Sequence, residues 1–98
     1  MILAKVVGNV WATRKEETLI GLKFLVVRPV TIRYDKNGVF NGLIEQDATL
    51  VVADRIGAGQ NEIVMIASGS SARQSFENSH IPVDAMIIGI IDEETFSK

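Results

Sequence analysis

The stretch from Gly57 to Glu62 reads GAGQNE and follows an apolar run, which is a setting in which glycine-rich loops often hold phosphate groups. A phosphate-binding P-loop needs a lysine and a serine or threonine after its last glycine, and then a helix. Here the residues after Gly59 are Gln60, Asn61 and Glu62, and an apolar, β-branched run comes next. A dinucleotide fingerprint needs a third glycine and again a helix. The loop is therefore predicted to join two strands, with glycines that permit positive φ or close backbone approach.

Catalytic and metal-binding residues are also sparse. The chain has one histidine, His80, in the polar stretch ENSHIP, and no cysteine. Serines and aspartates that could join His80 in a Ser-His-Asp arrangement are Ser68, Ser70, Ser71, Asp84 and Asp92. Serines beside a glycine at a helix start are more typical of caps, and a lone histidine without cysteine is poor evidence for zinc. We expect no catalytic, cofactor-binding or metal-binding residues, and no enzyme activity.

The composition indicates one small domain, residues 1–98, that is unusually apolar for its size. Of the 98 residues, 47% are hydrophobic. A domain this small buries only about two-thirds of its unfolded surface, so the excess favours burial against partner chains. Ten basic and twelve acidic residues give a net charge of −2. Such a balance lacks the basic stripe that nucleic acids require.

No targeting or membrane-spanning segment is expected. The first ten residues, MILAKVVGNV, have a strand pattern that Lys5 interrupts, unlike the apolar segment of a secretory signal. The most apolar run, Ala85 to Ile91, is too short to cross a bilayer. We therefore expect a soluble, cytoplasmic protein without membrane association.

Five β-rich runs bounded by turn signals predict an all-β fold. The runs are 1–10, about 20–34, 48–53, 62–68 and 85–91. Asn37-Gly38, after the second run, is the strongest hairpin signal, and Pro29 marks an edge or a bulge within that run. Only the segment 70–78, SSARQSFEN, has the features of a helix. This pattern predicts a small five-stranded OB-like β-barrel with one short helix between the fourth and fifth strands.

The last two runs are apolar on both faces. In a small barrel one face of each strand fills the interior and the other meets solvent. In the fifth run one face carries Met86, Ile88 and Ile90, and the other carries Ala85, Ile87 and Ile91. One helix of two turns cannot cover both outer faces. We therefore interpret the excess apolar face as a subunit interface, and not as ordinary exposed surface.

Four short motifs occur in order along the chain. They are Gly8 to Val27 (GNVWATRKEETLIGLKFLVV), Asp54 to Glu62 (DRIGAGQNE), Gly69 to Arg73 (GSSAR) and Pro82 to Ala85 (PVDA). Together they resemble the EutN/CcmL family of bacterial microcompartment vertex proteins. Asn61 stands where the family commonly has glycine. Asparagine is the residue next most tolerant of left-handed backbone, so we expect the shape of the loop to persist.

The resemblance implies a barrel that assembles into a pentamer at the fivefold corners of an icosahedral shell, next to hexameric shell proteins. The function would be structural, in the shell of a microcompartment such as a carboxysome or an ethanolamine-utilisation compartment. By the same resemblance a loop near the fivefold axis would border a narrow pore, and it consists of Gly57, Ala58, Gly59, Gln60, Asn61 and Glu62. Residues predicted at the subunit interface are Arg73, Met86, Ile88 and Ile90. A hexamer remains an alternative to the pentamer, because a small change in the angle between subunits alters their number in the ring.

The residues alone leave two alternative functions, a binding module and an enzyme. An OB-type barrel can bind single-stranded nucleic acid or another ligand, with aromatic side chains stacked on bases. We favour core or interface packing for Trp11 and the other aromatic residues, and the acidic balance argues against nucleic acid. A small enzyme would need His80 and a nearby serine at hydrogen-bonding distance in a pocket. The vertex protein is the preferred interpretation.

Overall fold

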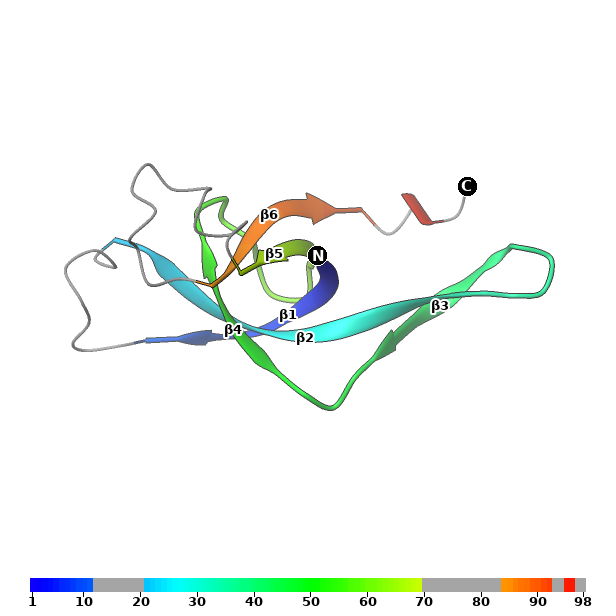
Figure 1. The fold of residues 1–98 in the computed structure, drawn as a ribbon, viewed down its shortest axis with the longest axis horizontal. Coiled ribbons are helices and arrows are strands. Elements are labelled where there is room, and N and C mark those ends of the chain that lie inside the picture. The colour runs from blue at the N-terminus through cyan, green and yellow to red at the C-terminus, as the bar shows by residue number, and fades with distance from the viewer. Residues whose placement is uncertain (12–20, 70–83, 93–94, 97–98) are drawn as a thin grey trace.

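A computed structural model describes residues 1–11, 21–69, 84–92 and 95–96 (Figure 1). Six strands lie in this part of the chain: β1 (Ile2–Val10), β2 (Lys23–Tyr34), β3 (Phe40–Glu45), β4 (Leu50–Asp54), β5 (Ile63–Ser68) and β6 (Ala85–Ile91). The all-β prediction is confirmed. The prediction of five strands is wrong, because β3 is a sixth. The helix predicted over residues 70–78 lies outside the described residues.

The additional strand β3 forms a hairpin with the second half of β2. Its sequence, FNGLIE, contains an asparagine and a glycine, which weaken the strand pattern. The two strands pair antiparallel, and the turn between them is held by Asp35, whose Oδ1 accepts hydrogen bonds from the N–H groups of Asn37 and Val39 at 2.8 and 3.0 Å. Gly38 has a φ of 79°. The hairpin signal at Asn37-Gly38 is therefore confirmed.

The other five strands pair in a closed ring, in the order β1-β5-β6-β4-β2 and back to β1. Every pairing in the ring is antiparallel except β4 with β6, which is parallel and has one registered pair, Ala53 with Met86. The β2–β3 hairpin projects from the ring along the longest axis of the molecule (Figure 1). The extents along the three principal axes are 50 × 24 × 20 Å. Closing the ring leaves β3 as the strand with a free edge.

Pro29 lies where β2 changes partners. Pairing with β3 begins at Val30, opposite Glu45, and pairing with β4 ends at Val27, opposite Leu50. The carbonyl of Pro29 accepts a hydrogen bond of 2.9 Å from the N–H of Gln46, in the connection between β3 and β4. Proline has no N–H to donate, so it fits this interruption of the ladder. The structure has no bulge at Pro29, which pairs with Ala4 of β1 within a continuous strand; its other edge lies where β2 passes from β4 to β3.

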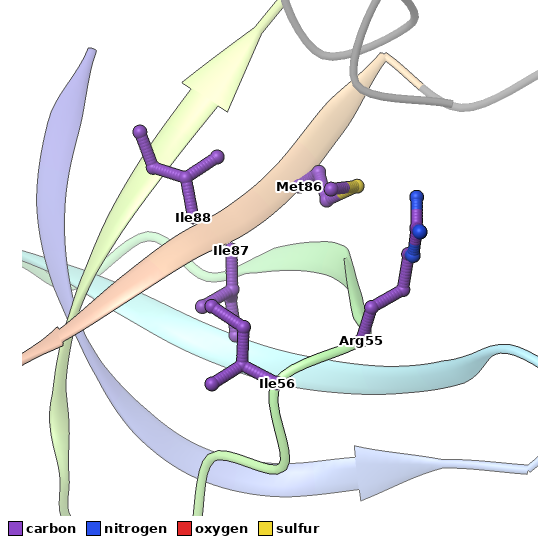
Figure 2. A pocket seen from close by; sticks show the side chains of 5 residues that line it. All are labelled: Arg55, Ile56, Met86, Ile87 and Ile88. Carbon is purple, nitrogen blue, oxygen red and sulfur yellow. The ribbon is translucent and has the colours of Figure 1, made fainter. Parts of the chain in front are cut away.

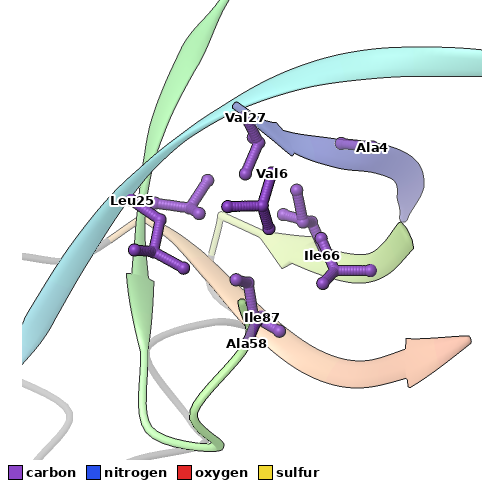
Figure 3. Close-up of a cluster of buried hydrophobic side chains, with 9 residues drawn as sticks. Ala4, Val6, Leu25, Val27, Ala58, Ile66 and Ile87 are labelled. Carbon is purple, nitrogen blue, oxygen red and sulfur yellow. The ribbon is translucent and has the colours of Figure 1, made fainter. Parts of the chain in front are cut away.

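The hydrophobic core fills the inside of the ring (Figure 3). The buried cluster consists of Ala4, Val6, Leu25, Val27, Val52, Ala58, Val64, Ile66 and Ile87. Each strand of the ring contributes at least one side chain, and Ala58 comes from the loop after β4. On β5, Val64 and Ile66 point inward with 0% and 1% exposure, as the alternation of a small closed sheet requires.

A β-bulge in β6 changes the predicted alternation. The pairing with β5 passes from Ile87 opposite Ile66 to Gly89 opposite Met65, so Ile88 is the extra residue. Ile88 and Ile90 are 37% and 41% exposed. Met86, which was predicted to share their outer face, is instead buried. The exposed apolar side chains of β6 are therefore Ile88, at the bulge, and Ile90, which the bulge places opposite the inward-pointing Val64.

Candidate functional site

The turn after β4 is organised around the buried carboxylate of Asp54, which is 2% exposed. Its Oδ1 accepts hydrogen bonds from the N–H groups of Ile56 and Gly57 at 2.9 and 3.1 Å, and its Oδ2 accepts one from Ala58 at 2.8 Å. Backbone N–H groups that converge in this way form a cradle for an anion. The cradle already holds the chain's own carboxylate, which is a second reason why this glycine loop does not hold a phosphate.

The rest of the loop is fixed against β1. The N–H of Asn61 donates to the carbonyl of Val6 at 2.9 Å, and the N–H of Val6 donates to the carbonyl of Glu62 at 3.0 Å. The side-chain amide of Gln60 donates to the carbonyl of Val7 at 3.0 Å. Because both its start and its end are tied to the ring, the loop has one defined shape.

Backbone conformation explains two residues of the loop. Gly57 has a φ of 98°, and Asn61 has a φ of 69°, the left-handed region that asparagine tolerates best after glycine. Asn61 thus adopts the left-handed conformation on which the expectation for the loop depends. Gly59 serves another purpose: a Cβ there would lie 3.2 Å from Glu62 Oε1, and that carboxylate accepts a hydrogen bond from the N–H of Gly59.

The six residues predicted to border a pore differ in their exposure. Gly57, Gln60 and Asn61 are exposed, whereas Gly59 and Glu62 are half-buried. Ala58 is 4% exposed and belongs to the core cluster, so its methyl group anchors the loop to the inside of the ring. The surface that this loop offers is therefore made by Gln60, Asn61 and the glycine backbone.

A groove lies between this turn and β6 (Figure 2). It has a volume of about 410 Å³ and is lined by Arg55, Ile56, Met86, Ile87 and Ile88. Ile56 is 50% exposed, and the one charged residue of the lining is Arg55. An apolar groove with a cation beside it is suited to receive an apolar or aromatic side chain. Its lining carries no nucleophile and no general base.

Trp11 follows β1 and is the most exposed large hydrophobic residue of the described part of the chain, at 88%. It borders a smaller pocket of about 100 Å³, together with Asn9, Val10, Lys23, Phe24 and Leu25. Core packing, one of the two uses predicted for Trp11, is therefore wrong. Phe96 does serve the core: it is 7% exposed and packs on Phe40 with ring centroids 5.7 Å apart.

Glu45, at the end of β3, pairs with one basic side chain of β1 and one of β2. Glu45 lies 3.3 Å from the Nζ of Lys5 and 3.6 Å from a guanidinium nitrogen of Arg28. Both pairs are partly exposed, so each contributes little to stability.

Several predicted residues lie outside the described part of the chain. They are Arg73 of the expected interface and Ser70, Ser71 and His80 of the formal catalytic set. Within the described ranges, no group of three or more His, Asp or Glu residues could hold a metal ion. No helix in those same ranges is long and apolar enough to cross a membrane.

The fold and this surface define a small all-β domain with a rigid loop and an apolar exterior suited to protein–protein contact. The chain belongs to the family described as ethanolamine utilisation protein EutN/carboxysome, whose model matches residues 1–92. It is 45% identical over 92 residues to the bacterial microcompartment shell vertex protein GrpN of Rhodospirillum rubrum, covering 94% of this chain and 93% of that protein. It is 40% identical to the carboxysome shell vertex protein CcmL of Thermosynechococcus vestitus, covering 94% and 84%.

Solved structures agree with the sequence comparison. The GrpN pentameric microcompartment shell protein from Rhodospirillum rubrum superposes with a TM-score of 0.75 at 46% identity, covering 94% of each chain. A structure described as the ethanolamine utilization protein EutN superposes with a TM-score of 0.78 at 36% identity, covering 95% of this chain and 88% of that one. The resemblance seen in the sequence motifs is therefore confirmed over nearly the whole chain.

Proposed function

We propose that this chain is a structural shell protein of a bacterial microcompartment, and that five copies form a ring that caps a fivefold vertex of the shell. The observation that carries this proposal is the similarity to the GrpN pentameric shell protein, at 46% identity and a TM-score of 0.75 over 94% of both chains. Another relative, CcmL, is described as a carboxysome shell vertex protein. Similarity of this extent supports the same kind of assembly.

The geometry of the chain supports assembly rather than catalysis. The closed ring of five strands acts as the OB-like barrel, with the predicted helix between β5 and β6. Ile88 and Ile90 remain exposed on the outside of β6, where a neighbouring copy would cover them. The predicted interface therefore comprises Ile88 and Ile90, with Met86 at the groove beside them and Arg73 reaching a carboxylate of the neighbour. No enzyme activity is part of this function.

The loop from Gly57 to Glu62 lies near the fivefold axis in this proposal. Its attachment to Asp54 and to β1 supports a fixed border for a narrow pore, because five copies of a flexible loop would not keep one opening. Gln60 and Asn61, which are exposed, would face that opening. The partners are further copies of this chain and hexameric shell proteins, in a microcompartment of the cytoplasm.

Native mass spectrometry of the purified chain tests the proposal. Five copies of the 10.7 kDa chain give about 54 kDa, the mass of a closed pentamer. Mixing this species with a hexameric shell protein is then expected to convert open sheets or tubes into closed shells, visible by electron microscopy. A chain that remains monomeric near 11 kDa would contradict the proposal, and a ring of six would exclude the fivefold vertex. Single-stranded DNA is expected to give no salt-dependent mobility shift.

A further inference from the structure

We propose that Trp11 is the anchor of the contact between neighbouring copies, and that its indole docks in the groove lined by Arg55, Ile56, Met86, Ile87 and Ile88 of the next copy. The inference rests on the ring proposed above. It assigns the two surfaces that meet in that ring, one on each side of the same chain.

The exposure of Trp11 is the first observation. An indole that is 88% exposed leaves most of a large apolar surface in water, although burying an aromatic side chain removes about 150–250 Å² from solvent. Tryptophan is among the residues most enriched in the energetic centres of protein–protein interfaces. Trp11 lies directly after β1, so the ring of strands fixes the point from which its side chain projects.

The groove offers an indole both apolar and charged contacts. It is an open surface groove of about 410 Å³, which is large enough to receive an indole. Ile56 and Ile88 give it apolar walls, and both are partly exposed in the single chain. Arg55 places a guanidinium beside it, and a cation over an aromatic face is attractive.

The shape of the groove depends on Asp54. Its Oδ1 accepts the N–H of Ile56, so the hydrogen bonds that order the loop also hold Ile56 beside β6 (Figure 2). The floor of the groove includes Ile87, which is fully buried in the core. The groove is therefore formed before any partner arrives, which reduces the entropy lost on association.

The two surfaces lie on different sides of the ring, as a cyclic assembly requires. Trp11 follows β1, whereas the groove is formed by β6 and the end of β4. In the ring, β5 separates β1 from β6 on one side, and β2 and β4 separate them on the other (Figure 1). A contact between two different surfaces of the same chain is heterologous, and repeating it closes a ring. A second copy is thus the occupant for which the chain itself carries both halves.

Fluorescence quenching tests the anchor, because Trp11 is the only tryptophan of the chain. In the native ring, Trp11 is expected to emit at a shorter wavelength than free tryptophan and to resist quenching by acrylamide. Trp11→Ala should weaken the contact by about thirtyfold or more, equivalent to ~2 kcal/mol, so the ring mass is lost at low micromolar concentration. Trp11→Phe should retain the ring. The matched control is Tyr34→Ala, which removes another exposed aromatic side chain and should leave the ring intact.

Chemical cross-linking tests the pairing of the two surfaces, because the chain contains no cysteine. Asn9→Cys places a thiol beside Trp11, with β2 between it and β4, and Ile56→Cys places one at the groove. A chain that carries both substitutions should form a covalent ladder of up to five chains with a short bis-maleimide. Each single variant should form none, because a heterologous contact does not bring equal positions together. The control pair, Asn9→Cys with Tyr34→Cys, should also give no ladder.

The outcomes separate this inference from the proposed function. An intact pentamer in which Trp11 is quenched like free tryptophan, or in which the double-cysteine chain gives no ladder, would overturn the inference and leave the vertex function standing. An unchanged pentamer of Trp11→Ala would do the same. A wild-type chain that is monomeric would overturn both. If Trp11→Ala does not fold, the quenching and the ladder still decide the matter.

Discussion

The Oδ2 atom of Asp54 accepts a hydrogen bond of 2.8 Å from the backbone N–H of Ala58, and this contact joins the exposed turn to the core. The methyl group of Ala58 belongs to the buried cluster, and Asp54 is itself 2% exposed. Arg55 and Ile56, which lie between these two residues, are therefore held on the outside of the ring. One buried carboxylate thus sets both the glycine loop and the groove beside β6.

Substitution of Asp54 by asparagine is expected to destabilise the fold by about 1–3 kcal/mol, because the amide nitrogen cannot accept a hydrogen bond and a buried N–H loses its acceptor. The measurement is the midpoint of urea unfolding. Asp35→Asn is the matched control, since Asp35 also accepts two backbone N–H groups, at the exposed hairpin turn. Its effect should be smaller, and equal midpoints for Asp54→Asn and the wild type would contradict the role of Asp54.

Asn61 has a φ of 69°, which a residue with an ordinary side chain adopts at a cost of roughly 1–2 kcal/mol. Asn61→Ala is therefore expected to lower stability by about 1 kcal/mol, and Asn61→Gly to leave it unchanged or slightly higher. Thermal unfolding of the two variants measures the difference. Gln60→Ala serves as a control in the same loop. If alanine and glycine at position 61 gave the same melting temperature, the loop would not require the left-handed conformation.

Ile88→Asp and Ile90→Asp are expected to abolish assembly while leaving each chain folded. Ile88 is 37% exposed and Ile90 is 41% exposed in the single chain, so the new carboxylate is in contact with water until a partner covers it. Native mass spectrometry should show monomers, and circular dichroism should show an unchanged strand signal. Ile87→Asp is the contrasting variant, because Ile87 is fully buried and a charge there should prevent folding. A stable pentamer of either outer variant would remove β6 from the interface.

Phe96→Ala is expected to detach the C-terminal residues from the projecting hairpin. Phe96 packs on Phe40, which in turn contacts the ring of Tyr34 edge-on at 6.2 Å. Full burial of a phenylalanine stabilises by about 1.5–3 kcal/mol, and this contribution would be lost. Hydrogen exchange should then become faster in β3 and unchanged in β5. Tyr34→Phe, which keeps the ring and removes only the hydroxyl, should retain slow exchange.

The strand pattern could be predicted because it depends on local chemistry. β-Branched runs and the Asn-Gly turn predicted five of the six strands and the hairpin. The sixth strand, β3, has a weak pattern of its own and forms because the second half of β2 offers it an edge, which only the assembled sheet provides.

The candidate site was predicted less completely. In the sequence Asp54 stands out only as the first residue of a motif, although an aspartate at the start of a turn commonly accepts hydrogen bonds from the backbone N–H groups that follow it. Arg55 and Ile56 had no distinguishing pattern. Their importance depends on β6, which begins about thirty residues later in the chain and pairs with β4 at Ala53 and Met86.

The sequence by itself determined that the chain is an all-β domain with more apolar surface than it can bury, because strand propensity and composition are properties of the residues in order. The tertiary structure decided which of those apolar side chains remain outside. The bulge at Ile88 breaks the alternation of β6 and places Ile90 opposite Val64. Ile88 and Ile90 remain exposed while Met86 and Ile87 are buried, and Trp11 after β1 is exposed. Register and bulges arise from pairing between distant strands, and a one-residue change in pairing moves side chains from one face to the other.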